Sequence, residues 1–414
     1  MGKSSVKWLP LFLSNFLGVF NENLLKNSII FISVSWVIPF GLSYSQLISV
    51  ASAALIFPYL VLSPLAGLLA VKYKKKNVFT IMKLIEIPVM IIAAVAFWFQ
   101  NTNIALFSLF IMGILACLYS PSKYSLIRDI GGEEGVSFGS GIFETMAFIG
   151  VLTGTIVASL ISDKFNIYLQ ALLFIGVAIG GYLVTTRIKA NEDTGYVSEF
   201  GSLNPIRFLI SSYKFAHHKH HLNSAVLGTS VFWLVGSMLQ MNLVIHCKHI
   251  YHLSNTSTGI VMAIAAIGIA AGCSTAGKLS GHGIRPGLIP AGLFAMILLL
   301  ITLLFVPLSQ TFFYILIFSI AFSGGFVQVP SLSMIQHAPI GKEIGNMIGY
   351  MNFVTFLFIF IGAAIFSAVT YFTNENSYAV FAAILVICTA TFAYYLLISP
   401  DFTSGIKQLV SSKS

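Results

Sequence analysis

The sequence predicts an all-α membrane protein with about twelve transmembrane helices, from its composition, its segment lengths and the demands that lipid makes on a backbone. Of the 414 residues, 57% are hydrophobic and 8% are charged, and the mean hydropathy is +0.91. Soluble domains carry about 25% charged residues. Backbone groups in lipid must be hydrogen-bonded internally, so only helices or closed barrels span a membrane. The apolar runs are roughly 20 to 27 residues long without strand-like alternation, so each can cross the bilayer core as a helix.

Twelve apolar segments follow one another along the chain, with turn-forming residues such as Pro39, Gly41, Gly131 and Gly132 in the gaps. The predicted spans are residues 9–37, 46–71, 78–99, 103–127, 136–161, 166–186, 222–247, 255–280, 284–307, 311–336, 343–371 and 376–398.

The longest polar stretch, residues 187–221, divides these segments six and six. We therefore expect an N-terminal six-helix bundle in residues 1–190 and a cytoplasmic central linker in residues 191–221. A C-terminal six-helix bundle with a short cytoplasmic tail is expected in residues 222–414.

The basic residues predict the orientation. If the N-terminus is cytoplasmic, the outer loops hold only Lys164 and Lys248, while Lys26, Lys83 and Lys123 fall within or at the ends of helices. The other seventeen of the 22 Lys and Arg residues are cytoplasmic: Lys3, Lys7, Lys72, Lys74, Lys75, Lys76, Arg128, Arg187, Lys189, Arg207, Lys214, Lys219, Lys278, Arg285, Lys342, Lys407 and Lys413. This bias predicts a multi-pass protein with both termini in the cytoplasm. It also explains the net charge of +9 without a nucleic-acid partner.

A short internal repeat supports two parallel halves. Residues 66–69 read Ala-Gly-Leu-Leu and precede a basic cluster, and residues 276–279 read Ala-Gly-Lys-Leu and precede Arg285. Gly67 and Gly277 thus occupy matching positions about half the chain apart. Parallel repeats of this kind describe the major facilitator fold. The acidic residue usual in the first of these loops is missing.

Small residues at four-residue spacing predict close helix packing. They are Gly150 and Gly154, Gly268 and Gly272, and Gly341, Gly345 and Gly349. In the major facilitator fold we expect segment 136–161 to face 255–280, and segment 46–71 to face 343–371. These glycines, with Gly67 and Gly277, act either as plain packing positions or as gating hinges.

Ionisable groups inside the membrane are costly and mark candidate functional sites. Six fall within the first half: Glu22, Lys26, Lys83, Glu86, Lys123 and Glu144. The second half offers softer polar groups: Gln240, His246, Gln328, Gln336, His337, Asn346 and Asn352. The sequence therefore predicts an asymmetric cavity, charged on one wall and polar to apolar on the other.

Each charged candidate also has a structural interpretation. Glu22 and Lys26 are four residues apart and Lys83 and Glu86 three apart, so either pair can form a local ion pair. Lys123 lies near the predicted cytoplasmic end of its segment, where a lysine can extend its ammonium to the interface.

Glu144 has no local partner, and a hydrogen bond between helices is its structural interpretation. The basic cluster of the linker consists of His217, His218, Lys219, His220 and His221. It fits either a metal site or a patch that faces anionic lipids.

Enzyme signatures are absent from the sequence. It contains no G-x-x-x-x-G-K-[ST] phosphate loop and no His-x4-Asp acyltransferase pattern, and its G-x-S-x-G match at residues 135–139 opens an apolar helical segment instead of following a strand, as a nucleophile motif would. The four cysteines, Cys117, Cys247, Cys273 and Cys388, fall in apolar segments without metal-ligand spacing. We therefore expect a protein that is not an enzyme and that binds neither a cofactor nor a metal.

Several motifs carry a family resemblance. Residues 20–26 read FNENLLK and residues 120–126 read SPSKYSL, similar to F-N-D-N-x-x-K and G-P-x-K-Y-S-x. Further matches are Glu144, Gly150, Gly154, Phe232-Trp233, Gln240, Leu279-Ser280-Gly281 and Gln336-His337. Over most of residues 10–370 the chain resembles the lysophospholipid transporter family of the major facilitator superfamily. Glu22 departs from the aspartate of the family motif, which affects headgroup selectivity more than the fold.

This resemblance implies movement of lysophospholipid from the outer to the inner leaflet of the bacterial inner membrane by alternating access. Some relatives carry a fused acyltransferase that this chain lacks, so the implied partners are the amphiphile, membrane lipids and a separate acyltransferase. The implied substrate-binding residues are Asn21, Glu22, Asn23, Lys26, Lys123, Glu144, Gln240 and His337. Lysines can donate to a phosphate, and a glutamate can accept from an amine.

Three alternatives remain open. A proton-coupled transporter of another amphiphile, a drug or a siderophore would use Glu22 or Glu144 as its proton site. A membrane-embedded scaffold for an acyltransferase would need no transport at all. A divalent-metal carrier would rely on His246 and His337.

Overall fold

The computed structural model describes residues 7–32, 36, 44–163, 166–190, 192, 202–219, 221–253, 255–281 and 283–398. Within these residues the regular structure is helical, with no strand. Several sequence predictions lie outside the described residues: the turn at Pro39 and Gly41, the C-terminal tail, Lys3, Lys164, His220, Lys407 and Lys413.

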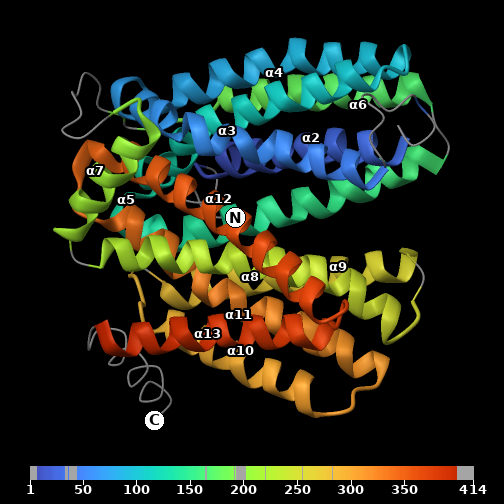
Figure 1. Cartoon of the computed structure of the whole chain (residues 1–414). Coiled ribbons are helices and arrows are strands. Elements are labelled where there is room, and N and C mark those ends of the chain that lie inside the picture. The colour runs from blue at the N-terminus through green and yellow to red at the C-terminus, as the bar shows by residue number, and fades with distance from the viewer. Residues whose placement is uncertain are drawn as a thin grey trace. The chain divides into compact units, whose positions relative to one another are not determined.

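The helices agree with the predicted spans to within a few residues at most ends (Figure 1). They are α2 (Leu9–Ile32), α3 (Tyr44–Lys72), α4 (Lys75–Trp98), α5 (Thr102–Asp163), α6 (Ile167–Thr186), α7 (Pro205–His217), α8 (Leu222–His249), α9 (Asn255–Ser280), α10 (Leu288–Phe305), α11 (Gln310–His337), α12 (Ile344–Phe372) and α13 (Ser377–Ile398), with a 3-10 turn η3 (Gly341–Glu343) before α12.

Helix α5 contains two of the predicted spans. It is assigned as one helix of 62 residues, but Gly132 within it has φ 63° and ψ −171°. This left-handed conformation carries little cost only for glycine, so the chain changes direction there without a loop. The predicted segments 103–127 and 136–161 are the two arms on either side of Gly132.

Ten helices among the described residues are long and apolar enough to span a membrane. Helix α5 is one of these but supplies two spans. Helix α2 has 24 residues, which is long enough to span a membrane. It is less apolar than those ten helices because asparagines, Glu22 and Lys26 interrupt it. With these two adjustments the structure confirms the all-α fold with twelve transmembrane helices.

The chain divides into two compact units, and each takes one segment from the opposite half of the sequence. Unit 1 consists of Met1–Gly132, Ile149–His218 and Pro339–Phe353. Unit 2 consists of Glu133–Phe148, Lys219–Ala338 and Val354–Ser414. The bundle boundaries at residues 190 and 222 stay a prediction.

In unit 1, helix α6 packs against α4 and α2, and α3 packs against α2, α4 and α7. Aromatic rings fill its core: Phe97 lies edge-on to both Trp36 and Phe174, with centroid distances of 4.9 and 5.5 Å. The residues that carry the site therefore project from helices held by a dense apolar core.

In unit 2, helix α11 packs against α8, α9 and α10, and α13 packs against α8 and α10. An aromatic cluster joins the second arm of α5 to α8. Phe148 stacks on Trp233 with centroids 5.8 Å apart and lies edge-on to Phe232 at 6.3 Å. Large apolar side chains such as Phe305 and Leu397 stay exposed on this unit, as expected for helices that face lipid.

Two of the glycine pairs pack against helices other than those expected. A Cβ on Gly150 or Gly154 would lie 2.9 or 2.5 Å from the carbonyl oxygen of Phe16 or Phe20 in α2. A Cβ on Gly272 would meet the Phe322 carbonyl oxygen of α11. Segments 136–161 and 255–280 do face each other as expected, but through residues other than these two pairs, because small residues permit a close approach without specifying the partner.

The contact between the second arm of α5 and α9 uses another glycine. A Cβ on Gly141 would lie 2.7 Å from the Cys273 carbonyl oxygen and 2.9 Å from the Cα of Gly277. Gly268 packs instead on Phe318 of α11, where its Cβ would lie 2.6 Å from the carbonyl oxygen.

Helix α3 does pack on the start of α12. A Cβ on Gly67 would lie 2.8 Å from Asn346 Oδ1, and one on Gly349 would lie 2.9 Å from the Ser63 carbonyl oxygen. A Cβ on Gly345 would meet Ala70 at 2.8 Å. Whether these glycines act as gates stays a prediction.

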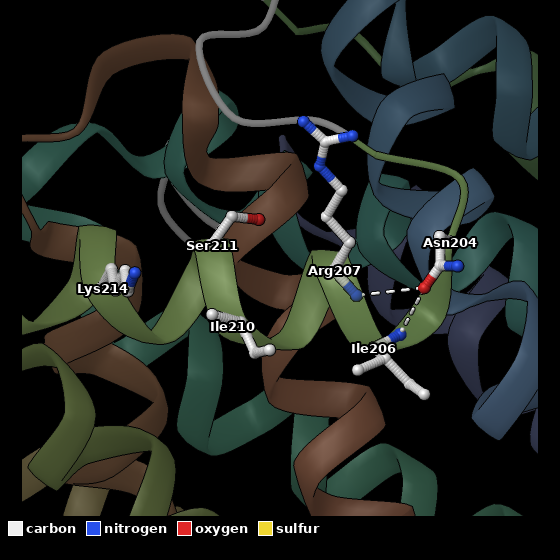
Figure 2. A pocket seen from close by; sticks show the side chains of 6 residues that line it. All are labelled: Asn204, Ile206, Arg207, Ile210, Ser211 and Lys214. Carbon is white, nitrogen blue, oxygen red and sulfur yellow. Dashed lines mark hydrogen bonds between the residues drawn. The ribbon is translucent and has the colours of Figure 1, made fainter.

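The linker contains a helix that the sequence reading missed (Figure 2). Helix α7 begins after Asn204, whose Oδ1 accepts hydrogen bonds from the backbone nitrogens of Ile206 and Arg207 at 3.0 and 3.1 Å. Pro205 occupies the first turn, where its missing N–H carries no cost. The Asn-Pro pair was therefore a readable start signal within the predicted polar linker.

Candidate functional site

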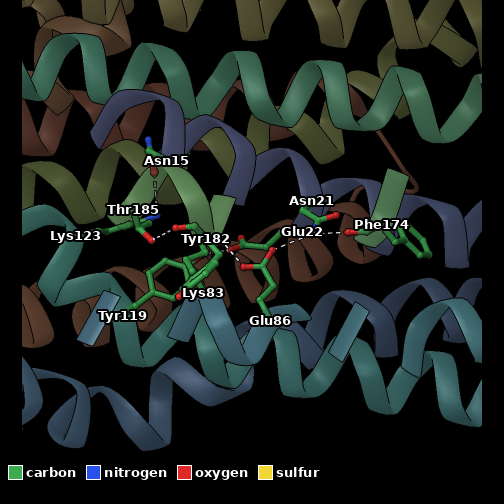
Figure 3. A network of polar contacts seen from close by, with 10 residues as sticks. All are labelled: Asn15, Asn21, Glu22, Lys83, Glu86, Tyr119, Lys123, Phe174, Tyr182 and Thr185. Atoms are coloured by element: carbon green, nitrogen blue, oxygen red, sulfur yellow. Dashed lines mark hydrogen bonds and ion pairs between the residues drawn. The ribbon is translucent and has the colours of Figure 1, made fainter. Parts of the chain in front are cut away.

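A polar network lies inside unit 1, and Tyr119 of α5 is at its centre (Figure 3). The Tyr119 hydroxyl donates to Glu22 Oε1 of α2 at 2.6 Å. The ammonium groups of Lys83 and Lys123 lie 5.0 and 5.3 Å from the centroid of the same ring. Cations at this distance are attracted to the face of an aromatic ring, more strongly where water is excluded. Tyr119 thus links two cations and one carboxylate.

A buried ion pair forms the second part of the network. Lys83 Nζ of α4 lies 2.5 Å from Glu86 Oε2, and both side chains are 1% exposed. Asn21 Nδ2 of α2 donates to the other carboxylate oxygen of Glu86 at 2.8 Å. The local pair expected three residues apart is therefore present. A buried charge is tolerated only when it is paired and hydrogen-bonded. Asn21, Lys83 and Glu86 therefore depend on one another for their stability.

Two glycines lie beside the Lys83 side chain. A Cβ on Gly18 of α2 would lie 2.6 Å from Lys83 Nζ and 3.4 Å from the Tyr119 hydroxyl. A Cβ on Gly181 of α6 would lie 3.8 Å from Lys83 Cδ. The Lys83 ammonium therefore occupies space that a side chain at position 18 would restrict, whereas the distance at Gly181 is an ordinary van der Waals contact.

Lys123 points into unit 1. Its side chain is buried, and its ammonium donates to Asn15 Oδ1 of α2 at 3.1 Å. The ring of Tyr124 lies 5.5 Å from the same nitrogen. The interpretation in which Lys123 extends to the membrane surface was therefore wrong, because an asparagine and two aromatic rings hold its charge inside.

The residues of the helix α2 motif have different environments. Glu22 is half-buried and takes its hydrogen bond from Tyr119, while Lys26 interacts with it through charge. Asn23 donates back to the Val19 carbonyl oxygen of its own helix at 2.9 Å. Of this motif, Asn21 and Glu22 therefore join the network, whereas the Asn23 side chain bonds to the backbone of its own helix.

The remaining predicted site residues belong to unit 2. Glu144 is 1% exposed and lies near Cys273 of α9. Gln240 is exposed on α8, and His337 is half-buried at the end of α11. The network thus belongs to unit 1, and Glu144, Gln240 and His337 belong to unit 2.

His246 has a structural environment of its own in unit 2. Its Nδ1 lies 2.9 Å from Ser377 Oγ, and four rings surround it at 4.9 to 5.6 Å: Tyr251, Phe313, Tyr378 and Phe381. Phe313 lies in the first turn of α11, whereas His337 ends this helix of 28 residues, which is about 40 Å long. His246 and His337 therefore cannot share a metal ion.

The described residues hold no group of three or more His, Cys, Asp or Glu side chains that could bind a metal. In the basic cluster of the linker, His218 Nδ1 contacts the Lys214 carbonyl oxygen at 2.7 Å, and His220 lies outside the described residues.

Sequence reasoning missed Tyr119, Asn15 and Gly18. A signal was present for the first two. Tyr119 precedes Lys123 by four residues and Asn15 precedes Glu22 by seven, so each shares a helix face with a candidate that was recognised. Gly18 carried no comparable signal, because its role depends on a lysine from another helix.

The arrangement has a clear chemical capacity. Two ammonium groups, a half-buried carboxylate and a tyrosine hydroxyl lie together inside a membrane-spanning unit. Charge-assisted hydrogen bonds are strong at such a site. The network therefore gathers groups of both charges among the membrane-spanning helices of unit 1.

The comparisons with known proteins agree with the fold. The family model described as Major Facilitator Superfamily matches residues 11–363. "Lysophospholipid transporter LplT" of Cronobacter sakazakii is 26% identical over 303 residues, which are 71% of this chain and 72% of that protein. The protein of the same name from Pectobacterium carotovorum is 24% identical over 303 residues, 71% of this chain and 70% of that protein.

Two solved structures are similar in fold. The human organic anion transporter MFSD10 superposes with a TM-score of 0.78 at 13% identity, covering 95% of this chain and 99% of that one. The fucose:proton symporter FucP of E. coli gives 0.73 at 14% identity with the same coverage.

Proposed function

Because the chain belongs to the major facilitator superfamily, we propose that it is a secondary transporter that moves lysophospholipids from the outer to the inner leaflet of the bacterial inner membrane. Both termini are then cytoplasmic, as the distribution of basic residues favours. A separate acyltransferase would re-acylate the delivered lysolipid.

The observation that carries this proposal is the network around Tyr119. A membrane protein keeps buried charges where function requires them, and these charges match the two ends of a zwitterionic headgroup. The relatives named lysophospholipid transporter support the same cargo.

Each charged group then has a role. Lys123 donates to the lysolipid phosphate, and Glu22 accepts from a headgroup amine. Lys83 and Glu86 neutralise each other and hold Asn21 in place.

The test uses sealed spheroplasts from cells that lack their own lysolipid uptake. Labelled lysophosphatidylethanolamine is added outside, and its conversion to diacyl lipid is followed. We expect Lys123→Ala to lower conversion about tenfold or more at low lysolipid concentration, because a hydrogen bond to a charged group contributes about 1.5–3 kcal/mol.

The matched control is Lys278→Ala, which removes an exposed lysine from the end of α9 and should convert lysolipid as the wild type does. Repeating the assay with the proton gradient collapsed reports the coupling. Equal conversion by Lys123→Ala and wild type contradicts the assigned role of Lys123. Wild-type conversion no higher than background, with the protein shown to be inserted, contradicts lysolipid transport and favours another amphiphile.

A further inference from the structure

Helix α7 has one face packed against the rest of unit 1. At about 100° per residue, Phe208, Ser212 and Ala216 share a side, and all three are buried. The helix packs against α3. This face fixes the orientation of the helix and determines which residues remain outside.

The opposite face carries an exposed apolar row. Leu203 before the helix, and Ile206, Ile210 and Tyr213 within it, are 66%, 70%, 50% and 53% exposed. Their spacing of three, four and three residues places them in a single stripe. An apolar row on a face that is not packed against the protein marks an interaction surface.

Basic residues flank this row on one side. Arg207 and Lys214 are exposed and lie about 60° and 40° further around the helix than Ile210. With Asn204, Ile206, Ile210 and Ser211 they line a groove of about 460 Å³ (Figure 2). Residues 203–217 contain no acidic side chain, so the surface matches a partner that is apolar and anionic.

The linker is held at the end of unit 1 where α3 finishes and α4 begins. Both carboxylate oxygens of Glu192 lie 3.2 Å from the Lys76 backbone nitrogen, which donates to them in the first turn of α4. Because α3 and α4 both span the membrane, their shared end marks the boundary between lipid and water. Helix α7, which packs against α3, lies at this same end of unit 1 (Figure 1), which is the depth where an amphipathic helix meets lipid headgroups.

We propose that α7 lies in the headgroup region of the adjoining leaflet, with Leu203, Ile206, Ile210 and Tyr213 in lipid and with Arg207 and Lys214 bound to the phosphates of anionic phospholipids. Each basic side chain near an anionic surface increases the affinity for that surface about fivefold. The occupant is a lipid surface, which is separate from the transported cargo.

The test uses the full-length protein in nanodiscs, whose two leaflets have the same lipids, so it does not depend on orientation or on transport. Ile210→Cys is labelled with an environment-sensitive fluorophore; the four native cysteines are buried. Brominated phosphatidylcholine is the quencher, with or without phosphatidylglycerol. We expect quenching at position 210 that increases with phosphatidylglycerol, and weaker quenching at a label on His218→Cys.

Two charge variants complete the test. Arg207→Ala with Lys214→Ala should abolish most of the dependence on phosphatidylglycerol. Arg187→Ala with Lys189→Ala, which removes two exposed charges after α6, should leave it unchanged. A label at position 210 that stays water-exposed in every lipid mixture overturns the proposal and assigns this face to a protein partner. If both double variants lose the dependence of quenching on phosphatidylglycerol to the same extent, the specific role of α7 is overturned.

Discussion

Tyr119 shows how one side chain can organise a charged site. Its hydroxyl donates to Glu22, and its ring lies against the ammonium groups of Lys83 and Lys123. These are separable interactions, because the hydroxyl can be removed while the ring stays. The residue therefore positions a carboxylate and interacts with two cations.

Tyr119→Phe tests the hydroxyl alone. We expect lower lysolipid conversion, by about tenfold, because Glu22 loses a charge-assisted hydrogen bond of about 1.5–3 kcal/mol. Thermal stability in detergent should fall less than in Tyr119→Leu, which also removes the ring from both cations. Wild-type conversion by Tyr119→Phe would show that the position of Glu22 does not depend on this hydroxyl.

Lys83→Ala tests whether the pair with Glu86 is structural. The variant leaves a buried carboxylate without its cation, so we expect a loss of about 3–5 kcal/mol in the free energy of unfolding, seen as a lower melting temperature. Lys83→Met with Glu86→Gln removes both charges at similar volume and should recover most of this loss. If the double variant is as unstable as Lys83→Ala, the unpaired Glu86 carboxylate is not the cause of the loss.

At the scale of elements, the sequence predicted where helices lie and which segments face each other better than which glycines make the contacts. Apolar length defines a span, so segment 255–280 matches α9 at both ends. Packing partners depend on the shapes of two surfaces, and Gly150 therefore lies on α2. Helix α7 was missed because an interfacial helix mixes exposed apolar and basic residues and resembles a polar linker by composition.

Gly272→Ala tests the contact between α9 and α11. Its Cβ would meet the Phe322 backbone, so the helices must separate, and overpacking of this kind costs about 1–3 kcal/mol. We expect a lower melting temperature in detergent. Gly259→Ala in the same helix places its Cβ in open space and should be neutral or slightly stabilising. Equal melting temperatures for the two variants would contradict the close approach.

At the scale of the whole molecule, composition and the internal repeat predicted twelve spans and the superfamily fold. They did not predict that residues 133–148 join unit 2 and residues 339–353 join unit 1. For the site, Glu22 and Lys123 were identified because charged groups stand out in apolar helices, whereas Asn21 was named through the family resemblance of residues 20–26. Tyr119 and Gly18 do not stand out, since their roles exist only after four helices come together.

The orientation of the whole chain is tested by single introduced cysteines. The native cysteines are buried, so labelling reports the new position. In intact cells we expect a membrane-impermeant maleimide to label Thr373→Cys, between α12 and α13, and to label Lys189→Cys only after the membrane is opened. The reverse pattern would place both termini outside and contradict the positive-inside assignment.

The aromatic stack in unit 2 also has an optical consequence. The chain has four tryptophans, Trp8, Trp36, Trp98 and Trp233, and Trp233 is the single one whose residue number falls in unit 2. Replacing the other three by phenylalanine leaves an emission spectrum that comes from the stack on Phe148 alone. In that variant, tryptophan fluorescence therefore reports on unit 2 alone, because unit 1 no longer contains a tryptophan.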